Sequence, residues 1–232
     1  MEINQLEIQV RKHMNMICDV SAATSVLSWD QETYMPSGAA YARAEQTSTL
    51  AALIHQMMTG DTAKKLSDDI REALEQNKEV SPLAKLFLDD YVKACKLPEE
   101  LVRKTSKSTS LAHESWKNAR QASDFSLFQK SLQELVELKS EAAELYGYAQ
   151  DRYDALLNLY EPGLTASELT PVFDTLKIAT IELLQSIEPH KDKVSDELML
   201  RHYPHEAQLA FSAQIAEKIG FNFENGRIDL AA

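Results

Sequence analysis

The chain has 232 residues, of which six are glycine, seven are proline and two are cysteine. Average usage of glycine and proline together is about 12%, so this sparse use of the two residues that interrupt helices predicts a helical protein. The formal net charge of −12 at pH 7 repels phosphate backbones and anionic lipid, which argues against nucleic acid and membrane surfaces as partners.

Cysteine usage and the first ten residues bear on the cellular compartment. Cys18 and Cys95 lie far apart and form no Cys-x-x-Cys motif, which favours reduced, buried thiols over a disulfide or a cysteine-based zinc site. Residues 1–10 lack the basic start and apolar run of a signal peptide. No later run approaches the roughly eighteen apolar residues of a membrane span. We therefore expect a cytoplasmic protein with no membrane attachment.

A single long helix is predicted at the N-terminus. Its apolar residues recur at intervals compatible with one helix face, at Ile3, Leu6, Val10, Ile17, Val20 and Leu27. At 1.5 Å per residue a helix that ends near Trp29 would be about 40 Å long, which suits the wall of a large helical body better than a minimal bundle. Pro36 and Gly38 then require the chain to turn.

Further helices follow, for a total of about eight. Ser81 and Pro82 are typical of an N-cap and a first helical residue, and Thr165 with Glu168 forms a capping box. The helices predicted after the first one span residues 39–58, 62–77, 82–95, 98–122, 124–146, 165–187 and 204–219.

The last ten residues change character. Residues 221–224 and 227–230 have the pattern of short strands, and Asn225-Gly226 between them is the strongest dipeptide signal for a hairpin turn. The predicted fold is therefore all-α, a multi-helix array with one long N-terminal helix and a short β-hairpin at the C-terminal end.

The histidines do not have the spacing of a helical zinc site, which would need two of them four positions apart. His113-Glu114 begins like the metallopeptidase motif H-E-x-x-H, but Lys117 occupies the second ligand position and would repel a cation. We interpret His113 as an interfacial residue of an amphipathic helix. His202 and His205 flank a predicted helix start, where capping or solvent exposure is favoured over metal binding.

Two other kinds of site are also disfavoured. The chain contains no Gly-x-Ser-x-Gly elbow and no glycine-rich phosphate loop, so hydrolases and nucleotide-binding folds of those types are excluded. The basic stretch RKTSKSTS at residues 103–110 lies inside a predicted helix, and we interpret it as a solvated face and not as an anion site.

Aromatic and acidic residues cluster in residues 29–36, which we expect to form the loop after the first helix. In one interpretation Trp29 anchors the helix end in the core while Asp30 or Glu32 accepts hydrogen bonds from the free amides of the next helix. In the other, the same side chains contact a substrate. The residue types fit the first interpretation better.

The segment around this cluster resembles a known family. LSWDQETYMP at residues 27–36, followed by Gly38, Arg43 and Gln46, is similar to the N-terminal signature of the carboxypeptidase Taq family of zinc metallocarboxypeptidases. The agreement continues through WKNARQASDFSLF at 116–128, YDALL at 153–157, YEPG at 160–163, and residues 169–176 and 220–229. It covers essentially the whole chain.

The resemblance implies an almost wholly helical protein split by a deep channel, in which an H-E-x-x-H helix and a later glutamate hold zinc. In the family these ligands and the general base lie C-terminal to the matched region. We therefore expect residues 1–232 to be the N-terminal region of a longer zinc-dependent metallocarboxypeptidase, which removes C-terminal residues from peptide substrates. The region would form one wall of the channel, bind no zinc itself and be inactive alone.

Within the signature, Trp29, Asp30 and Arg43 are the residues that the resemblance implies for substrate binding. It assigns no catalytic residue and no metal ligand to this chain.

A second hypothesis is a helical interaction module without catalysis, which holds partners on its exposed faces. Under the first hypothesis, helices that line a channel would keep uncovered apolar surface, so we expect a homodimer or larger self-association. Exchange of the long first helix or, preferably, of the hairpin with its unpaired edges would provide the contact.

Overall fold

The computed structural model describes residues 3–230, and these are helical with no strand among them. The all-α prediction is confirmed. The chain divides into two compact units, Met1–Gly163 (unit 1) and Leu164–Ala232 (unit 2), and each is described by itself.

Unit 1 begins with the predicted long helix, which continues past Trp29. Its helices are α1 (Ile3–Thr33), the 3-10 helix η1 (Ser37–Ala39), α2 (Ala40–Thr59), α3 (Asp61–Glu75), α4 (Pro82–Ala94), α5 (Glu99–Ala122), α6 (Ser126–Tyr146) and α7 (Arg152–Leu157).

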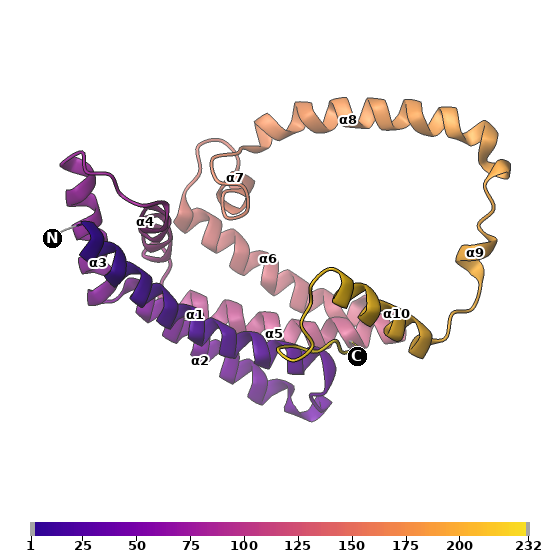
Figure 1. Ribbon diagram of the computed structural model, residues 1–232, viewed down its shortest axis with the longest axis horizontal. Coiled ribbons are helices and arrows are strands. Elements are labelled where there is room, and N and C mark those ends of the chain that lie inside the picture. The colour runs from indigo at the N-terminus through magenta and orange to yellow at the C-terminus, as the bar shows by residue number, and fades with distance from the viewer. Residues whose placement is uncertain (1–2, 231–232) are drawn as a thin grey trace. The chain divides into compact units, whose positions relative to one another are not determined.

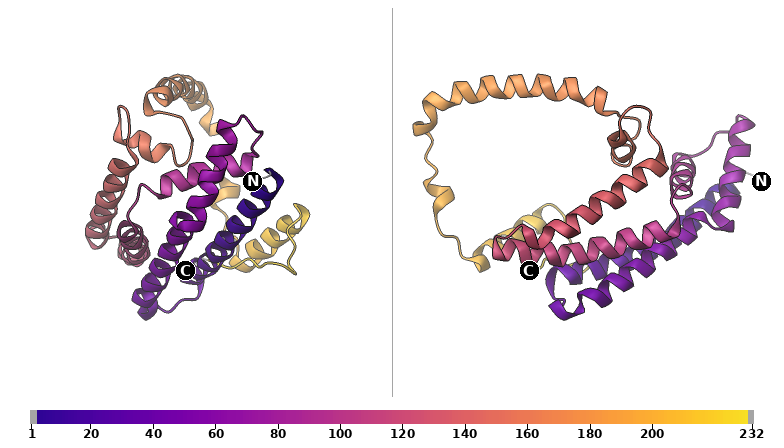
Figure 2. Two further views of the ribbon diagram at one scale, coloured as in Figure 1. Left: turned by 90° about the vertical axis from the view of Figure 1, so that its left-hand side faces the viewer. Right: turned by 180° about the vertical axis from the view of Figure 1, so that it is seen from behind.

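The main body of unit 1 is a row of long helices. α2 packs on α1 and, over a longer stretch, on α5, and α5 in turn packs on α6 (Figures 1 and 2). α7 packs on α6. α3 and α4 pack on each other and on both α1 and α2. α5 is therefore covered on two sides, which matters for its polar residues.

Helix boundaries in unit 1 follow the sequence signals closely. The Ser81 hydroxyl accepts a hydrogen bond from the amide of Ala84 at 3.3 Å, so the predicted N-cap of α4 is confirmed. Gly60 separates α2 from α3 with an extended backbone. A Cβ there would lie 2.8 Å from the carbonyl oxygen of Gln56, so the position requires glycine for a close approach and not for a positive φ.

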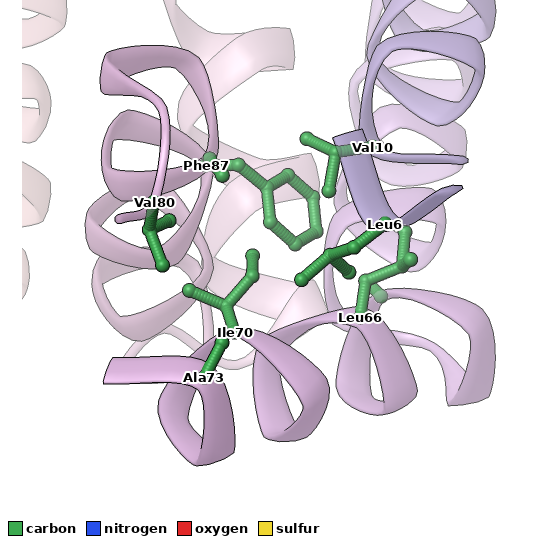
Figure 3. Close-up of a cluster of buried hydrophobic side chains, with 9 residues drawn as sticks. Leu6, Val10, Leu66, Ile70, Ala73, Val80 and Phe87 are labelled. Carbon is green, nitrogen blue, oxygen red and sulfur yellow. The ribbon is translucent and has the colours of Figure 1, made fainter. Parts of the chain in front are cut away.

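The main hydrophobic core of unit 1 joins α1, α3 and α4. Phe87 of α4 is fully buried and reaches between Val10 of α1 and Ile70 of α3 (Figure 3). Burial of a side chain of this size contributes about 1.5–3 kcal/mol. A smaller cluster of Leu101, Leu138 and Ala142 holds α5 against α6.

Both cysteines are exposed free thiols, so the prediction of buried thiols is wrong. Cys18 directly follows Ile17, which is buried, and successive residues of a helix point about 100° apart. Cys95 caps the C-terminal end of α4. Their positions on the helices, and not the general preference of cysteine for the interior, decide the exposure.

Unit 2 contains α8 (Ala166–Ile187), the 3-10 helix η2 (Glu188–Lys193), the single-turn α9 (Glu197–Leu200) and α10 (His205–Lys218). The capping box of α8 is confirmed, because the amide of Glu168 donates to the Thr165 hydroxyl at 3.3 Å and the amide of Thr165 donates to the Glu168 carboxylate at 2.9 Å. His202 and His205 are both exposed, as one alternative predicted.

The predicted C-terminal β-hairpin is absent from the described residues. A type I′ turn needs a positive φ at both Asn225 and Gly226, and neither residue has one. The chain turns earlier, where the amide of Asn225 donates to the carbonyl of Asn222 at 3.1 Å. The Asn222 side chain also accepts from the amide of Glu224 at 2.8 Å, and the ring of Phe221 lies against Gly226. This side-chain turn takes the place of the hairpin.

Within residues 3–230, no helix is both long enough and apolar enough to cross a membrane.

Candidate functional site

Most of the signature residues lie on the last two turns of α1 and on α2, and only residues 34–36 form a connection without helical structure. The carbonyl of Asp30 accepts from the amides of Tyr34 and Met35 at 3.0 and 2.8 Å, which extends helical hydrogen bonding past Trp29. Pro36 has an extended backbone and ends this run. The corner between α1 and α2 is therefore short.

Arg43 of α2 ties this corner together. Its Nη2 donates to the Asp30 carboxylate at 2.5 Å, and its Nη1 donates to the carbonyl of Leu27. Its Nε donates to the side-chain oxygen of Gln46 at 3.2 Å. The Arg43 side chain is only 11% exposed. We call Arg43, Asp30 and the Leu27 carbonyl the Arg43 clamp, which joins α2 to the C-terminal part of α1 through one charged and one neutral acceptor.

Trp29 is not an anchor in the core. Its side chain is 36% exposed, and its ring makes an edge contact with the more exposed ring of Tyr34, with ring centroids 5.6 Å apart. The predicted capping by Asp30 or Glu32 is also wrong, because no side chain caps the start of η1 or of α2. The helical continuation of α1 directs Asp30 to Arg43 and Glu32 to His113 instead.

A polar cavity of about 310 Å³ lies between α1, α2 and α5. Gln31 at its edge is buried, and its side chain donates to the carbonyl of Ser110 at 3.0 Å while the Ser110 hydroxyl donates back to Gln31 at 3.0 Å. The lining residues are Thr24, Ser28, Gln31, Glu32, Thr47, Ser106, Thr109, Ser110 and His113. This lining can hydrogen-bond a polar group, and the Ser110 hydroxyl donates to the amide oxygen of Gln31, which is not a base.

His113 bridges α5 to α1. Its Nε2 lies 3.3 Å from a carboxylate oxygen of Glu32, and its ring centroid lies 5.7 Å from that of Trp116. The interpretation of His113 as an interfacial residue is confirmed. In the described part of the chain, no three His, Cys, Asp or Glu side chains gather as a metal site would require. The residues present here therefore do not fit a zinc centre.

The basic stretch at 103–110 is not a solvated face, contrary to our prediction. Lys107 donates to the Glu45 carboxylate on α2, and Ser108 donates to Glu134 on α6 at 2.9 Å. Ser48 of α2 donates to the carbonyl of Arg103 at 3.0 Å. Because α5 is packed between two helices, polar residues on both flanks become contacts.

At the interface of α2 and α5, hydrogen bonds favour the charged forms of Glu45 and Lys107. The hydrogen bond from Lys107, followed by one from Tyr41, lowers the pKa of Glu45. The hydrogen bond to Glu45, followed by one to Tyr41, raises the pKa of Lys107. The Lys107 ammonium also lies 4.7 Å from the centroid of the Tyr41 ring.

Comparison with known proteins shows the family. The sequence model of the Carboxypeptidase Taq (M32) metallopeptidase family matches residues 9–232. The chain belongs to this family. The resemblance seen in the signature segment is thereby confirmed.

Two curated carboxypeptidases match nearly the whole chain. Carboxypeptidase 1 of Bacillus subtilis (strain 168) is 30% identical over 230 residues, which are 99% of this chain and 46% of that protein. Thermostable carboxypeptidase 1 of Thermus thermophilus is 33% identical and matches 90% of this chain and 43% of that protein. The chain spans about half the length of the curated relatives it matches.

Solved structures show the same fold. The structure named "BsuCP Crystal Structure" has a TM-score of 0.89 at 29% identity. The match covers 97% of this chain and 46% of the chain in that structure. The M32 carboxypeptidase from Deinococcus radiodurans R1 has a TM-score of 0.75 at 29% identity, and the match covers 98% of this chain and 46% of that one.

Sequence reasoning singled out Glu32, His113 and the stretch 103–110, but it missed the polar cavity at which these segments meet. Gln31 and Ser110 are 79 positions apart, so no local spacing joins them. Both are polar residues within helices, and polar residues of helices are usually exposed to solvent. Their residue types alone therefore did not indicate a buried contact.

Proposed function

We propose that this chain is the N-terminal region, residues 1–232, of a zinc-dependent metallocarboxypeptidase that removes C-terminal residues from peptides. The observation that supports the proposal is the match of residues 9–232 to a metallopeptidase family whose relatives are named carboxypeptidases. In this proposal the region forms one wall of the substrate channel.

The metal and the general base come, in this proposal, from residues beyond these 232. His113 has a single carboxylate neighbour and Lys117 at the position of a second ligand, so it does not offer a zinc site. The chain alone would therefore bind no zinc and cleave no peptide. Its own contribution would be to bind and orient the peptide.

We propose Trp29, Asp30 and Arg43 as the substrate-binding residues. Trp29 would contact the substrate, and the other two would position Trp29. The ring of Trp29 is partly exposed beside that of Tyr34, which offers an aromatic surface for contact with a peptide. The charges of Asp30 and Arg43 are paired with each other, so these two residues would act by holding the corner that presents Trp29.

Self-association and a cytoplasmic location are further parts of the proposal. Exchange of a C-terminal hairpin no longer offers a route, because the hairpin does not form. Exchange of the long first helix, α1, is the route that remains in this proposal. Two free thiols suit a reducing compartment, which supports the cytoplasm.

A single-chain chimera tests the function. Residues 1–232 would be joined to the part of Bacillus subtilis carboxypeptidase 1 that follows its match to this chain. We expect the chimera to release single residues from peptide C-termini, to lose this activity with a chelator, and to regain it with zinc. The chain alone should release none.

Substitution in the chimera tests the proposed role of Trp29. Trp29→Ala should raise KM about tenfold, equivalent to about 1.4 kcal/mol of binding, with little change in kcat. Tyr153→Ala removes another exposed aromatic ring, on α7, and should leave KM unchanged. A folded chimera that releases no residues would contradict the proposal and favour the non-catalytic interaction module.

A further inference from the structure

Helix α8 is apolar over most of its surface, yet unit 2 does not cover it. Eight large apolar side chains of this helix are between 44% and 61% exposed. They are Val172, Phe173, Leu176, Ile178, Ile181, Leu183, Leu184 and Ile187. The element of unit 2 that packs on α8 is η2, which continues directly from its C-terminal end.

Most of these residues share one face. Val172 or Phe173, Leu176, Leu183 or Leu184, and Ile187 follow one another at steps that a helix of 3.6 residues per turn places in one stripe. We call this the α8 stripe. It runs along nearly the whole helix, and polar residues such as Thr175 and Gln185 lie outside it.

Ile178 and Ile181 lie on a different side of α8 from the stripe. A helix with apolar residues on two sides is typical of a position between two neighbours in a larger core. A dimer formed through one face with two-fold symmetry would cover the stripe and leave this second side exposed. The distribution therefore favours several covering elements over a second copy of the chain.

The relatives indicate what those elements are. In the structure titled "BsuCP Crystal Structure", 97% of this chain is matched by only 46% of that chain, so more than half of that chain has no counterpart here. The same proportion holds for Bacillus subtilis carboxypeptidase 1. We infer that the α8 stripe is the docking surface for this remaining half of the M32 fold, and that the half binds there even when supplied as a separate polypeptide.

This inference rests on the N-terminal position assigned to the chain under the proposed function, but not on its catalytic activity. The probe is the part of Bacillus subtilis carboxypeptidase 1 that follows its match to this chain, produced separately. Mixed with the 232-residue chain, it should give a 1:1 complex in sedimentation velocity. Hydrophobic dye bound to the chain should be released, and the amides of α8 should gain protection from hydrogen exchange.

Substitutions on α8 make the test specific. Leu176→Asp with Leu184→Asp should weaken the complex on the order of 100-fold, because both side chains lie in the stripe. Thr175→Asp introduces the same residue on the same helix, outside the stripe and away from the side of Ile178 and Ile181, and should leave the affinity unchanged. Leu176→Ala with Leu184→Ala keeps helix propensity high and should weaken the complex about tenfold.

Three results would overturn the inference. The first is a complex that the stripe variants do not weaken. The second is a dimer of the chain that persists with the probe present and dissociates in the stripe variants, which would make a second copy the occupant. The third is a monomer that binds neither dye nor probe, which would mean that α8 is already covered within the chain. An inactive chimera together with a stripe-dependent complex would contradict the proposed function alone.

Discussion

Arg43 is the residue on which the corner between α1 and α2 depends. A guanidinium is suited to this place because it offers donors in several fixed directions, and here they serve Asp30, the Leu27 carbonyl and Gln46 at once. Lysine has a single charged nitrogen and would not reach the same set.

Replacement of Arg43 should therefore destabilise the chain measurably. Arg43→Ala leaves the half-buried Asp30 carboxylate without its cation and removes a second donor from the Leu27 carbonyl, and should lower the free energy of unfolding by about 1–3 kcal/mol. Arg43→Lys should lower the free energy of unfolding by a smaller amount, because the positive charge beside Asp30 is kept. Arg11→Ala removes an exposed pair with Glu7 and should change stability by less than about 1 kcal/mol. Urea denaturation measures all three, and equal losses for Arg43→Ala and Arg11→Ala would contradict the clamp.

Ser67 gives a second prediction at this scale. Its hydroxyl is fully buried in α3, and it has no hydrogen-bond partner among the described residues. Ser67→Ala should raise the free energy of unfolding by about 1 kcal/mol, because a buried unsatisfied hydroxyl is costly. Ser48→Ala is the matched control, since that buried hydroxyl donates to the carbonyl of Arg103. It should lower stability by about the same amount, and the same sign for both variants in urea denaturation would be evidence against this account.

At the scale of elements, α5 is the helix whose packing differs most from expectation. It contacts α2 on one side and α6 on the other, so its polar residues form interhelical bonds. The bond between Lys107 and Glu45 joins two titratable groups, and it shifts the pKa of both.

The pH dependence of the Lys107–Glu45 pair follows from both pKa shifts. Glu45 has a lowered pKa, so its contribution is present above the ordinary value of 4.5 and is lost as pH falls through the folded-state pKa. Lys107 has a raised pKa, so its contribution is present below 10.5 and is lost as pH rises through the folded-state pKa. Lys107→Ala should lower the melting temperature at neutral pH, and the difference from the unmodified chain should shrink as pH falls below 4.5, through the folded-state pKa of Glu45.

Lys104→Ala is the control for this measurement. Lys104 is an exposed lysine on the same helix, so its loss changes net charge equally. Thermal unfolding at several pH values should show a smaller effect for Lys104→Ala at neutral pH. If the two variants follow the same pH profile, the pair does not contribute to stability.

At the scale of the whole molecule, the two units differ in how much they bury. Unit 1 has a core around Phe87, Ile70 and Val10, whereas no residue of α8 or α10 is buried. In proteins most helical stability comes from packing and not from propensity.

Separate fragments should reflect this difference. Residues 1–163 should unfold cooperatively and keep their helical circular dichroism, because their core lies within unit 1. Residues 164–232 alone should be mostly unfolded at 25 °C, since α8 and α10 bury none of their residues and most helical stability comes from packing. Circular dichroism of the two fragments is the measurement, and a cooperative transition in the second fragment would show that unit 2 has a core of its own.

Much of the helical framework was predictable from local features. The spacing from Ile3 to Leu27, the cap at Ser81 and the capping box at Thr165 act over a few residues, so they specify helices without reference to the rest of the chain. The family could be recognised in the same way, from the run at 27–36 and its continuation along the chain.

The hairpin failed because a local signal was overruled. Asn225-Gly226 favours a type I′ turn, but such a turn is stable only when two strands pair beyond it. Here the Asn222 side chain bonds the amide of Glu224, and Phe221 lies against Gly226, so the backbone turns earlier and no ladder forms.

By itself, the sequence determined most of the helical segments, several of their starts, and the family to which the chain belongs, because helix capping and apolar spacing are local properties of the chain. Only the tertiary structure decided which polar side chains meet. Arg43 reaches Asp30 because α2 folds back on α1, and Gln31 reaches Ser110 because α5 packs beside both. Contacts between residues distant in the chain depend on the packing of whole helices, and no spacing within a single segment contains that information.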